Sequence, residues 1–230
     1  MTEPMHPRIV RLAILGGSGN EGSGLALRFG HAGYSVVLGS RTPEKAAEVC
    51  AALNRRLGRE AITFATNRAA AETAEIVILT VPYSAQAATV EAVREQLTGK
   101  ILVDATVPLR PPKVARVQLP PGGSAVAEMQ RALGEQVRVV SAFQNVSAEH
   151  LKDLDHVIDC DVLVCGDDVA AREVVIGLAK GINMRAWHAG PIVNSAVAEA
   201  LTSVLISINS RYKVSGAGIR ITGLDEVVGE

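Results

Sequence analysis

A glycine-rich segment near the beginning of the chain has the spacing of a phosphate-binding turn. Gly17-Ser18-Gly19-Asn20-Glu21-Gly22 reads G-x-G-x-x-G and directly follows an apolar run that favours a strand. Such glycines permit a tight bend and close approach of the backbone to a pyrophosphate, while the N-terminus of the next helix faces the anion. The segment could be a glycine-rich turn without a ligand, but a strand, a helix and a second strand in this order favour a dinucleotide site that includes all six residues, from Gly17 to Gly22.

The residues after the second expected strand indicate which dinucleotide is bound. A free ribose 2′-hydroxyl is usually met by Asp or Glu about 20 residues past the glycines, but this chain has Gly39-Ser40-Arg41 there, followed by Lys45. A hydroxyl and a guanidinium suit a phosphate dianion, because arginine presents a planar fork of donors. We therefore predict that Ser40, Arg41 and Lys45 bind the 2′-phosphate of NADP; the alternative is that Arg41 is only a solvated charge.

Other patterns point less clearly to chemistry. Thr80-Val81-Pro82-Tyr83 ends a strong strand, either on the crevice side of the sheet or as a plain strand terminator. Cys160 and Cys165 lie in or near one expected strand but five positions apart, so they face opposite sides, and buried free thiols are expected rather than metal ligands. The chain has no P-loop, zincin helix or Ser/His/Asp order. We predict no metal site and no catalytic acid, base or nucleophile.

Strands and helices alternate in a way that positions these residues at one edge of a sheet. Strands are expected at Arg8–Leu15, Ser35–Leu38, Ile62–Ala65, Ile76–Val81, Ile101–Val103, Val137–Ser141, Val162–Gly166 and Met184–His188. Helices are expected at Leu25–Phe29, Pro43–Leu57, Ala69–Thr73, Ser84–Leu97, Ser124–Leu133 and Val169–Lys180, with another from Gly190-Pro191 onward. Asp104 to Gly123, with five prolines, is expected to be an irregular loop or lid. The rhythm predicts an α/β fold with a doubly wound parallel sheet of Rossmann type. We divide it into an NADP-binding domain, 1–145, and a small α/β part for substrate and association, 146–230.

The last helix has apolar residues on one wide stripe. They stand at positions 192, 193, 196, 197, 200, 201, 204, 205 and 208, whereas Ser195, Glu199, Thr202 and Asn209 lie on the opposite side. We expect the stripe to cover the sheet and the small residues elsewhere to admit a second subunit, which predicts a homodimer.

Composition excludes several classes of protein. Hydrophobic residues make up 48% and charged residues 20% of the 230 residues, so the chain is not disordered. The net charge of −1 and the aromatic content of 3% provide neither the basic surface nor the stacking residues that are typical of nucleic-acid-binding proteins. No apolar run reaches the length of a transmembrane helix, and Met1 to Arg8 do not form a signal peptide. Three cysteines fit a reducing cytoplasm, where we expect a soluble protein.

Several blocks, in order along almost the whole chain, resemble the NADPH-dependent reductases of coenzyme F420, also called F420H2:NADP+ oxidoreductases. The more specific blocks lie in the C-terminal part. The blocks are Leu15-Gly16-Gly17-Ser18-Gly19-Asn20, Gly24-Leu25-Ala26-Leu27-Arg28, Gly39-Ser40-Arg41, Thr80-Val81-Pro82, Val164-Cys165-Gly166-Asp167-Asp168 and Ala189-Gly190-Pro191-Ile192-Val193-Asn194-Ser195.

The resemblance implies a function and further site residues. Hydride would pass directly between nicotinamide C4 of NADP(H) and C5 of the deazaflavin F420, a co-substrate, with the protein orienting the rings and excluding water. Val81, Ala85 and Val107 would line the ribose and nicotinamide, and the backbone of Ala148 would bind the carboxamide. The deazaflavin site would comprise Gln144, Asn145, Val146, Gly190, Pro191 and Asn194. The chain departs from the family at Gln144-Asn145, where members carry His-Thr, and at Glu21, where they carry an apolar residue.

Two other functions remain open from the residues. One is an NADPH-dependent reductase of another acceptor, such as a flavin, a quinone or an imine. Imine reductases normally have a larger helical C-terminal domain than the 85 residues that follow Asn145 here. The other is a non-catalytic NADP-binding sensor. The sequence does not give the physiological direction of hydride transfer or the preferred tail length of F420.

Overall fold

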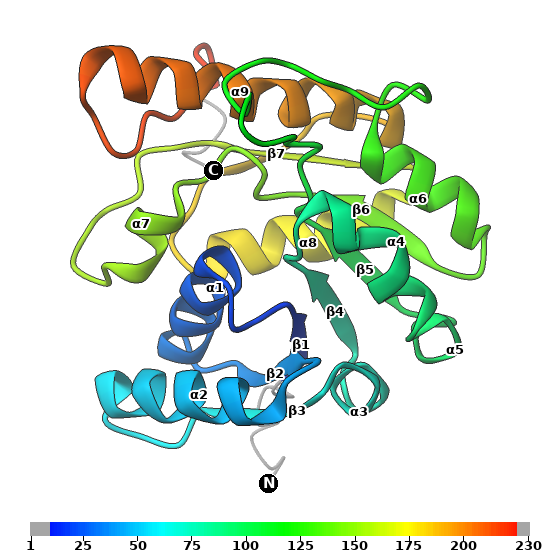
Figure 1. The fold of residues 1–230 in the computed structure, drawn as a ribbon, viewed down its shortest axis with the longest axis vertical. Coiled ribbons are helices and arrows are strands. Elements are labelled where there is room, and N and C mark those ends of the chain that lie inside the picture. Colours follow the sequence, from blue (N-terminus) through cyan, green and yellow to red (C-terminus); the bar gives the residue numbers. More distant parts are fainter. Residues whose placement is uncertain (1–9, 225–230) are drawn as a thin grey trace, which may run out of the picture.

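The computed structural model describes residues 10–224, and its centre is one sheet. The strands are β1 (Arg11–Leu15), β2 (Ser35–Ser40), β3 (Ile62–Thr66), β4 (Ile76–Leu79), β5 (Ile101–Asp104), β6 (Arg138–Ser141), β7 (Val162–Gly166) and β8 (Ala186–His188). Their order in the sheet is β3-β2-β1-β4-β5-β6-β7-β8 (Figure 1). The six strands from β3 to β6 are parallel, and the order reverses between β1 and β4. This confirms the predicted Rossmann-type sheet; Met1 to Arg8 lie outside the described residues.

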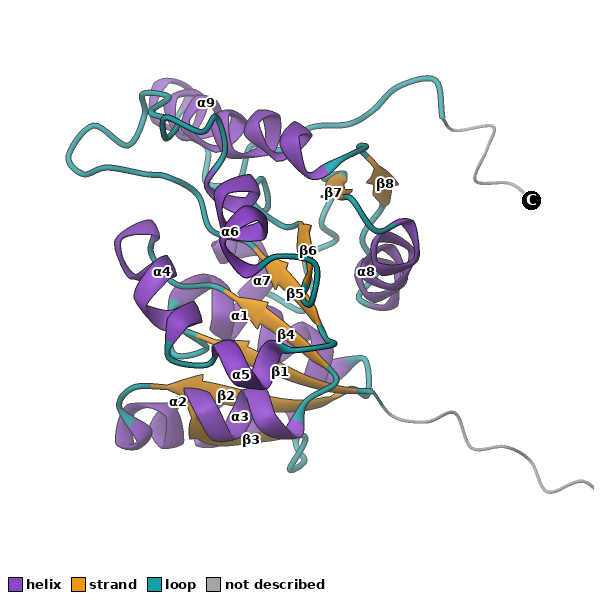
Figure 2. Cartoon of the chain, turned by 90° about the vertical axis from the view of Figure 1, so that its right-hand side faces the viewer, coloured by secondary structure: helices purple, strands orange, loops and turns teal. Residues whose placement is uncertain are grey.

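Helices cover both faces of the sheet, as Figure 2 shows edge-on. Apolar residues of α1 (Asn20–His31), α2 (Pro43–Leu57) and α8 (Val169–Gly181) form one buried cluster with the sheet, which also includes the short α7 (Ala148–Lys152). A second cluster on the other face takes in α3 (Asn67–Thr73), α4 (Tyr83–Glu91), α5 (Arg94–Leu97) and α6 (Ala125–Leu133). Because helices cover both faces of the sheet, its central strands are almost wholly apolar. Such continuous apolar runs can be recognised in the sequence, so the strands were predictable.

Two elements differ from the expected pattern. The predicted single helix Ser84–Leu97 is broken into α4 and α5, because buried Val93 takes a non-helical conformation (φ −126°, ψ 12°) between them. Strand β7 is antiparallel to β6, with Ser141 opposite Cys165. The segment that connects β6 to β7 contains the five-residue helix α7, which packs on α1. The strands β7 and β8 nevertheless continue the same sheet.

The C-terminal helix α9 (Ser195–Tyr212) follows the 3₁₀ turn η1 (Ile192–Asn194). Of the apolar stripe that we expected to be buried, Ile192 and Leu205 are buried, but much of the rest is exposed. The buried residues of α9 include Ser195, Glu199 and Ser203, whereas members of the apolar stripe such as Val197 and Val204 are 63% and 44% exposed. The cause is Glu199, whose carboxylate accepts hydrogen bonds from the backbone N–H groups of Ala125 (2.8 Å) and Val126 (3.1 Å) at the start of α6. Satisfying these N–H groups turns the polar face inward.

By length and composition alone, residues Ile192–Tyr212 are apolar enough to cross a membrane. This segment includes Glu199 and Arg211, so it is not an uncharged apolar run of the kind that the sequence was expected to lack. In the fold this segment packs on the protein through its polar side, with Glu199 only 1% exposed.

Candidate functional site

The glycine turn between β1 and α1 has the close packing that a phosphate-binding turn requires. A Cβ atom on Gly22 would lie 2.5 Å from Thr80 Oγ1 and 2.8 Å from the Gly16 carbonyl oxygen, and one on Gly17 would lie 2.7 Å from Leu38 Cδ2. Gly16 itself has a positive φ of 81°. Only glycine therefore fits at these positions without displacing β2 or β4, and the N-terminus of α1 is left open to an anion.

A hollow of about 220 Å³ lies between this turn and the end of β2. Ser40, Arg41 and Lys45, the residues predicted to bind the 2′-phosphate, line it together with Ser18 of the glycine turn. Ser40 is buried, and its Oγ accepts the backbone N–H of Thr42 at 3.0 Å, which fixes the tip of the strand. Three further polar residues line this hollow and were not predicted from the sequence, namely Thr42, Asn67 and Thr89.

A larger cleft of about 820 Å³ adjoins the hollow and shares Gly19, Thr80, Val81 and Pro82 with it. Predicted residues that line it are Asn20, Glu21, Val107, Gln144 and Val146. Its walls are largely apolar, and it opens at the carboxyl edge of the parallel strands, where open α/β sheets bind their ligands. Ala85 lines the hollow instead, beside Val81.

The proline-rich loop after β5 forms one wall of the cleft. It contributes Leu109, Arg110 and Val114, which the sequence identified only as part of a lid. The Arg110 guanidinium lies 6.0 Å from the ring centroid of Tyr83 on the opposite wall. Figure 1 shows the loop, in green, running alongside α9, where Ser203 Oγ donates to the Arg116 carbonyl oxygen at 3.2 Å. The helix therefore holds the loop in place over the cleft.

Gln144 forms the base of the cleft, and its contacts fix its orientation. Its Nε2 donates to the carbonyl oxygen of Asp104 and to Ser141 Oγ, both at 2.8 Å. The backbone carbonyl oxygen of Gln144 accepts a hydrogen bond from Thr202 Oγ1 of α9 at 2.8 Å. Because Nε2 is committed to two acceptors, Oε1 is the free end of the amide, and this atom is buried with no hydrogen-bond partner.

Glu21 and Asp104 place two carboxyl groups near this base. Asp104 is fully buried and accepts hydrogen bonds from Gln86 Nε2 (2.7 Å) and the Thr106 backbone N–H (2.9 Å). Burial of Glu21, followed by the nearby negative charge of Asp104, raises the pKa of Glu21 to about 8. Burial also raises the pKa of Asp104, although its hydrogen bonds oppose the shift. The cleft therefore contains a carboxyl group that keeps its proton at neutral pH.

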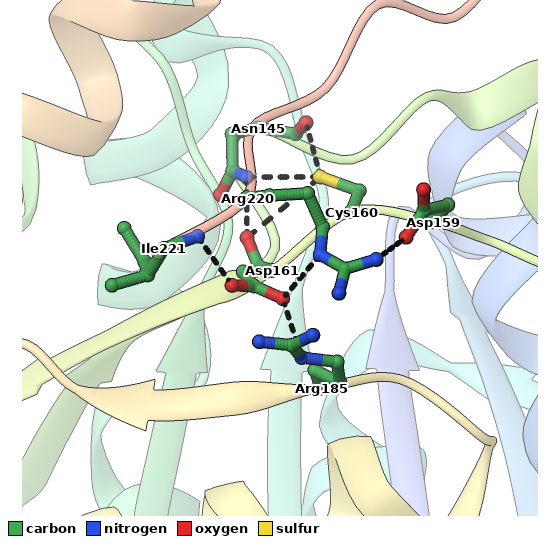
Figure 3. Close-up of polar contacts among 7 residues, drawn as sticks. All are labelled: Asn145, Asp159, Cys160, Asp161, Arg185, Arg220 and Ile221. Atoms are coloured by element: carbon green, nitrogen blue, oxygen red, sulfur yellow. Dashed lines mark hydrogen bonds and ion pairs between the residues drawn. The ribbon is translucent and has the colours of Figure 1, made fainter. Parts of the chain in front are cut away.

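Asn145 does not line this cleft but belongs to a hydrogen-bonded cluster with Cys160, Asp161 and Ile221, which we call the latch because it holds the C-terminal segment (Figure 3). Its Nδ2 donates to the Asp161 carbonyl oxygen at 2.8 Å and to Cys160 Sγ at 3.2 Å. Asp161 in turn accepts the backbone N–H of Ile221 at 2.7 Å and pairs with Arg185 at 3.0 Å. Phe143, the residue before Gln144, has a positive φ of 74°. After this turn the two neighbouring side chains separate, with Gln144 in the cleft and Asn145 in the latch.

The predicted residues Gly190, Pro191, Asn194 and Ala148 do not line either the hollow or the cleft. The carbonyl oxygen of Gly190 accepts from Gly166 at 3.1 Å, and Asn194 Nδ2 donates to the Ala189 carbonyl oxygen at 2.7 Å, so this block joins β7 to η1. Ala148 begins α7, where its carbonyl oxygen lies against Gly24 of α1. The wall that we expected from Gly190-Pro191 is formed by Thr202 and the proline-rich loop instead.

The cysteines are buried thiols, as predicted. Burial raises the pKa of Cys165 to about 11 and also raises that of Cys160, so neither is an activated thiolate. Within residues 10–224, no group of three or more His, Cys, Asp or Glu side chains is arranged to hold a metal ion.

Comparison with known proteins identifies the family. Residues 11–108 match the family described as NADP oxidoreductase coenzyme F420-dependent. The F420-dependent NADP reductase of Methanocaldococcus jannaschii is 44% identical over 224 residues, which cover 94% of this chain and 100% of that protein. The chain belongs to the F420-dependent NADP oxidoreductase family. The corresponding reductase of Methanothermobacter thermautotrophicus, 42% identical over 95% of this chain and 97% of its own length, supports the same assignment.

Solved structures agree on the fold of this family member. A putative F420-dependent NADP reductase from Arthrobacter superposes with a TM-score of 0.80 at 24% identity, covering 92% of this chain and 98% of that one. An imine reductase from Myxococcus stipitatus gives 0.59 at 20% identity, and the match covers 90% of this chain but only 62% of that enzyme. At these identities the likeness is one of fold alone, over nine-tenths of this chain or more.

Proposed function

We propose that this protein transfers hydride between NADP(H) and the deazaflavin coenzyme F420, with the dinucleotide extending from the hollow into the cleft and the deazaflavin in the cleft beside it. The observation that carries the proposal is the continuity of the two spaces at Gly19, Thr80, Val81 and Pro82. The relatives named F420-dependent NADP reductase support it over almost their whole length.

The donors and the shape of the hollow fit NADP. Ser40, Arg41 and Lys45 would hold the 2′-phosphate, and the glycine turn would hold the pyrophosphate on the N-terminus of α1. Gly17 and Gly22 form a cradle that any Cβ would fill. Val81, Ala85 and Val107 would line the ribose and nicotinamide. Ala148, by contrast, has no support from the pocket geometry as a ligand of the carboxamide.

The larger cleft fits a planar ring system. Val107, Leu109, Val114 and Val146 give it apolar walls, while the free Oε1 of Gln144 offers one acceptor at the base. When both are bound, NADP(H) and F420 supply the hydride chemistry between carbon atoms, and the chain stacks the rings and excludes water. Asn145, Gly190, Pro191 and Asn194, which the resemblance assigns to the deazaflavin site, are not among the residues that line this cleft.

The exposed apolar face of α9 supports a homodimer. Val193, Val197, Val204 and Ile208 are 57%, 63%, 44% and 36% exposed, and they lie on one side of η1 and α9. A second copy of the chain would cover them, since such a face is costly to leave in water. We propose a soluble cytoplasmic dimer of this kind.

Anaerobic mixing of NADPH with F420, free flavin and simple imines tests the proposed function, with absorbance as the readout. We expect F420 to be reduced and the flavin and imines to be left unchanged. Reduction of another acceptor but not of F420 would restrict the assignment to the NADP fold. NADPH binding without reduction of any acceptor would favour the sensor.

A further inference from the structure

We propose that Glu21 is the proton-exchange residue of this enzyme: its carboxyl group donates a proton to the deazaflavin as hydride arrives, and its carboxylate accepts that proton in the reverse reaction. The inference rests on the proposed function. The overall reaction, NADPH + F420 + H⁺ to NADP⁺ + F420H2, consumes one proton. The C–H bond of the dihydronicotinamide breaks, its electron pair forms a C–H bond on the deazaflavin, and a ring nitrogen takes the proton.

The position of Glu21 is the first support. It lies in the first turn of α1 and lines the cleft together with Gln144 and Thr80. The residue is only partly exposed, and its Oε1 is shut off from water without a hydrogen-bond partner. A buried polar atom that the protein leaves unpaired is costly. An orphaned carboxyl oxygen in a ligand cleft therefore indicates a group whose partner arrives with the ligand.

The neighbouring Asp104 differs from Glu21 in its hydrogen bonds, which oppose the rise that burial gives to the pKa of Asp104. Asp104 has hydrogen-bond donors on both oxygens, from Gln86 and Thr106, and these stabilise its ionised form. Glu21 Oε1 has none. Two close carboxyl groups whose surroundings differ in this way divide into one anion and one acid. With its pKa raised to about 8, Glu21 can both give and take a proton near neutral pH.

Other charged or titratable side chains stand on the elements around the cleft. Tyr83 begins α4, Arg110 lies on the proline-rich loop, and Lys152 of α7 donates to Asn20 Oδ1 at 2.7 Å, next to Glu21 in the chain. Of the groups around Glu21, Asp104 is the one that shifts its pKa. Asp104 therefore acts on Glu21 by raising its pKa, and it does so without contact with the substrate.

Gln144 complements this acid. Its free Oε1 accepts a hydrogen bond, whereas a protonated Glu21 donates one, so the cleft presents one acceptor and one donor that are not used within the protein. A ring that offers both a donor and an acceptor nitrogen or oxygen along its edge, as the pyrimidine part of a deazaflavin does, satisfies both atoms.

The test compares the wild-type protein with Glu21→Gln, which keeps the shape of the side chain but cannot transfer a proton. Glu149→Gln, at the first turn of α7, is the matched control. Three quantities are measured as a function of pH: the infrared carbonyl band of protonated carboxyl groups without ligand, the NADPH dissociation constant by fluorescence, and the single-turnover rate of hydride transfer in both directions. Circular dichroism checks that each variant folds.

We expect the wild-type infrared spectrum to show a carboxyl group titrating near pH 8 that is absent from Glu21→Gln and present in Glu149→Gln. F420 reduction by the wild type should slow as pH rises through that value, and F420H2 oxidation should accelerate. Glu21→Gln should lose about 100-fold or more in rate and both inflections, and the NADPH dissociation constant separates any loss of cofactor binding from the loss of proton transfer. Any titration of the substrates themselves would persist in the variant.

The inference is overturned if Glu21→Gln transfers hydride at the wild-type rate, or if it keeps the same pH inflections. It is also overturned if the infrared difference spectrum of the wild type and Glu21→Gln shows no carboxyl group that titrates above pH 6. If the wild type fails to reduce F420 although the infrared titration is found, the proposed function fails instead, and the two failures are thus distinguishable.

Discussion

Glu199 and Ser124 are joined by a hydrogen bond of 2.6 Å between two buried side chains, 75 positions apart in the chain. Ser124 Oγ in turn accepts the backbone N–H of Ala127 at 2.9 Å, so the pair caps α6 from two sides. We expect Glu199→Ala to lower the free energy of unfolding by about 2–4 kcal/mol, because it leaves buried N–H groups unpaired. Glu91→Ala, which removes an exposed partner of Arg94, should cost less than about 1 kcal/mol. Urea denaturation measures both, and equal losses would contradict the capping role.

The glycine turn makes a prediction that separates close packing from helix propensity. Gly22→Ala should destabilise the protein by about 1–3 kcal/mol, since its Cβ would lie 2.5 Å from Thr80 Oγ1. It should also weaken NADPH binding. Gly177→Ala in α8 meets no atom within 4 Å and should instead stabilise the protein by about 0.5–1 kcal/mol. Thermal unfolding and NADPH titration of the two variants provide the measurement; a stable Gly22→Ala with normal affinity would remove the reason for glycine there.

Arg41 should determine the choice between NADP and NAD. Arg41→Ala is expected to weaken NADPH binding by ~1.5–3 kcal/mol and to leave NADH binding little changed, because only NADPH carries the 2′-phosphate. Arg56→Ala, at the far end of α2, is the control for loss of a surface charge. Fluorescence titration with both dinucleotides decides the matter, and an equal loss for both would exclude a 2′-phosphate role.

The sequence was sufficient for those parts of the fold and site that depend on short-range patterns. The places of Gly17, Gly22 and Arg41 in the fold were predictable because they follow from spacing relative to one strand–helix–strand unit. The apolar strands were likewise predictable, as was the irregular conformation of the proline-rich loop.

The parts that could not be predicted depend on partners far away in the chain. The rotation of α9 follows from Glu199, whose hydrogen-bond donors lie in α6, and the apolar stripe alone favours the wrong face. Gln144 and Asn145 are adjacent and both polar, yet only one reaches the cleft. No periodicity distinguishes them, because the turn at Phe143 and the donors and acceptors on either side decide where each points.

The proposed dimer makes a prediction about the exposed face of α9. Val197→Lys combined with Val204→Lys places two charges on that face, so we expect it to convert a dimer of twice 24.1 kDa into a monomer at micromolar concentration. Val174→Lys, at a valine of α8 that is 43% exposed, should leave the mass unchanged. Light scattering measures the masses. A wild-type mass near that of one chain would contradict the dimer outright.

The last prediction locates the deazaflavin through Val146, which lines the cleft beside Gln144 and is 9% exposed. Hydride transfer requires the reacting carbons to lie ~3–3.5 Å apart, so bulk in this wall should prevent the rings from stacking. We expect Val146→Trp to abolish F420 reduction while the NADPH dissociation constant stays within about tenfold, or ~1.4 kcal/mol, of the parent value. Val157→Trp, at a residue that is 81% exposed and lines neither the hollow nor the cleft, is the control and should retain activity. If Val146→Trp still reduces F420 at the parent rate, the ring binds away from Val146, and the cleft beneath the proline-rich loop is not its site.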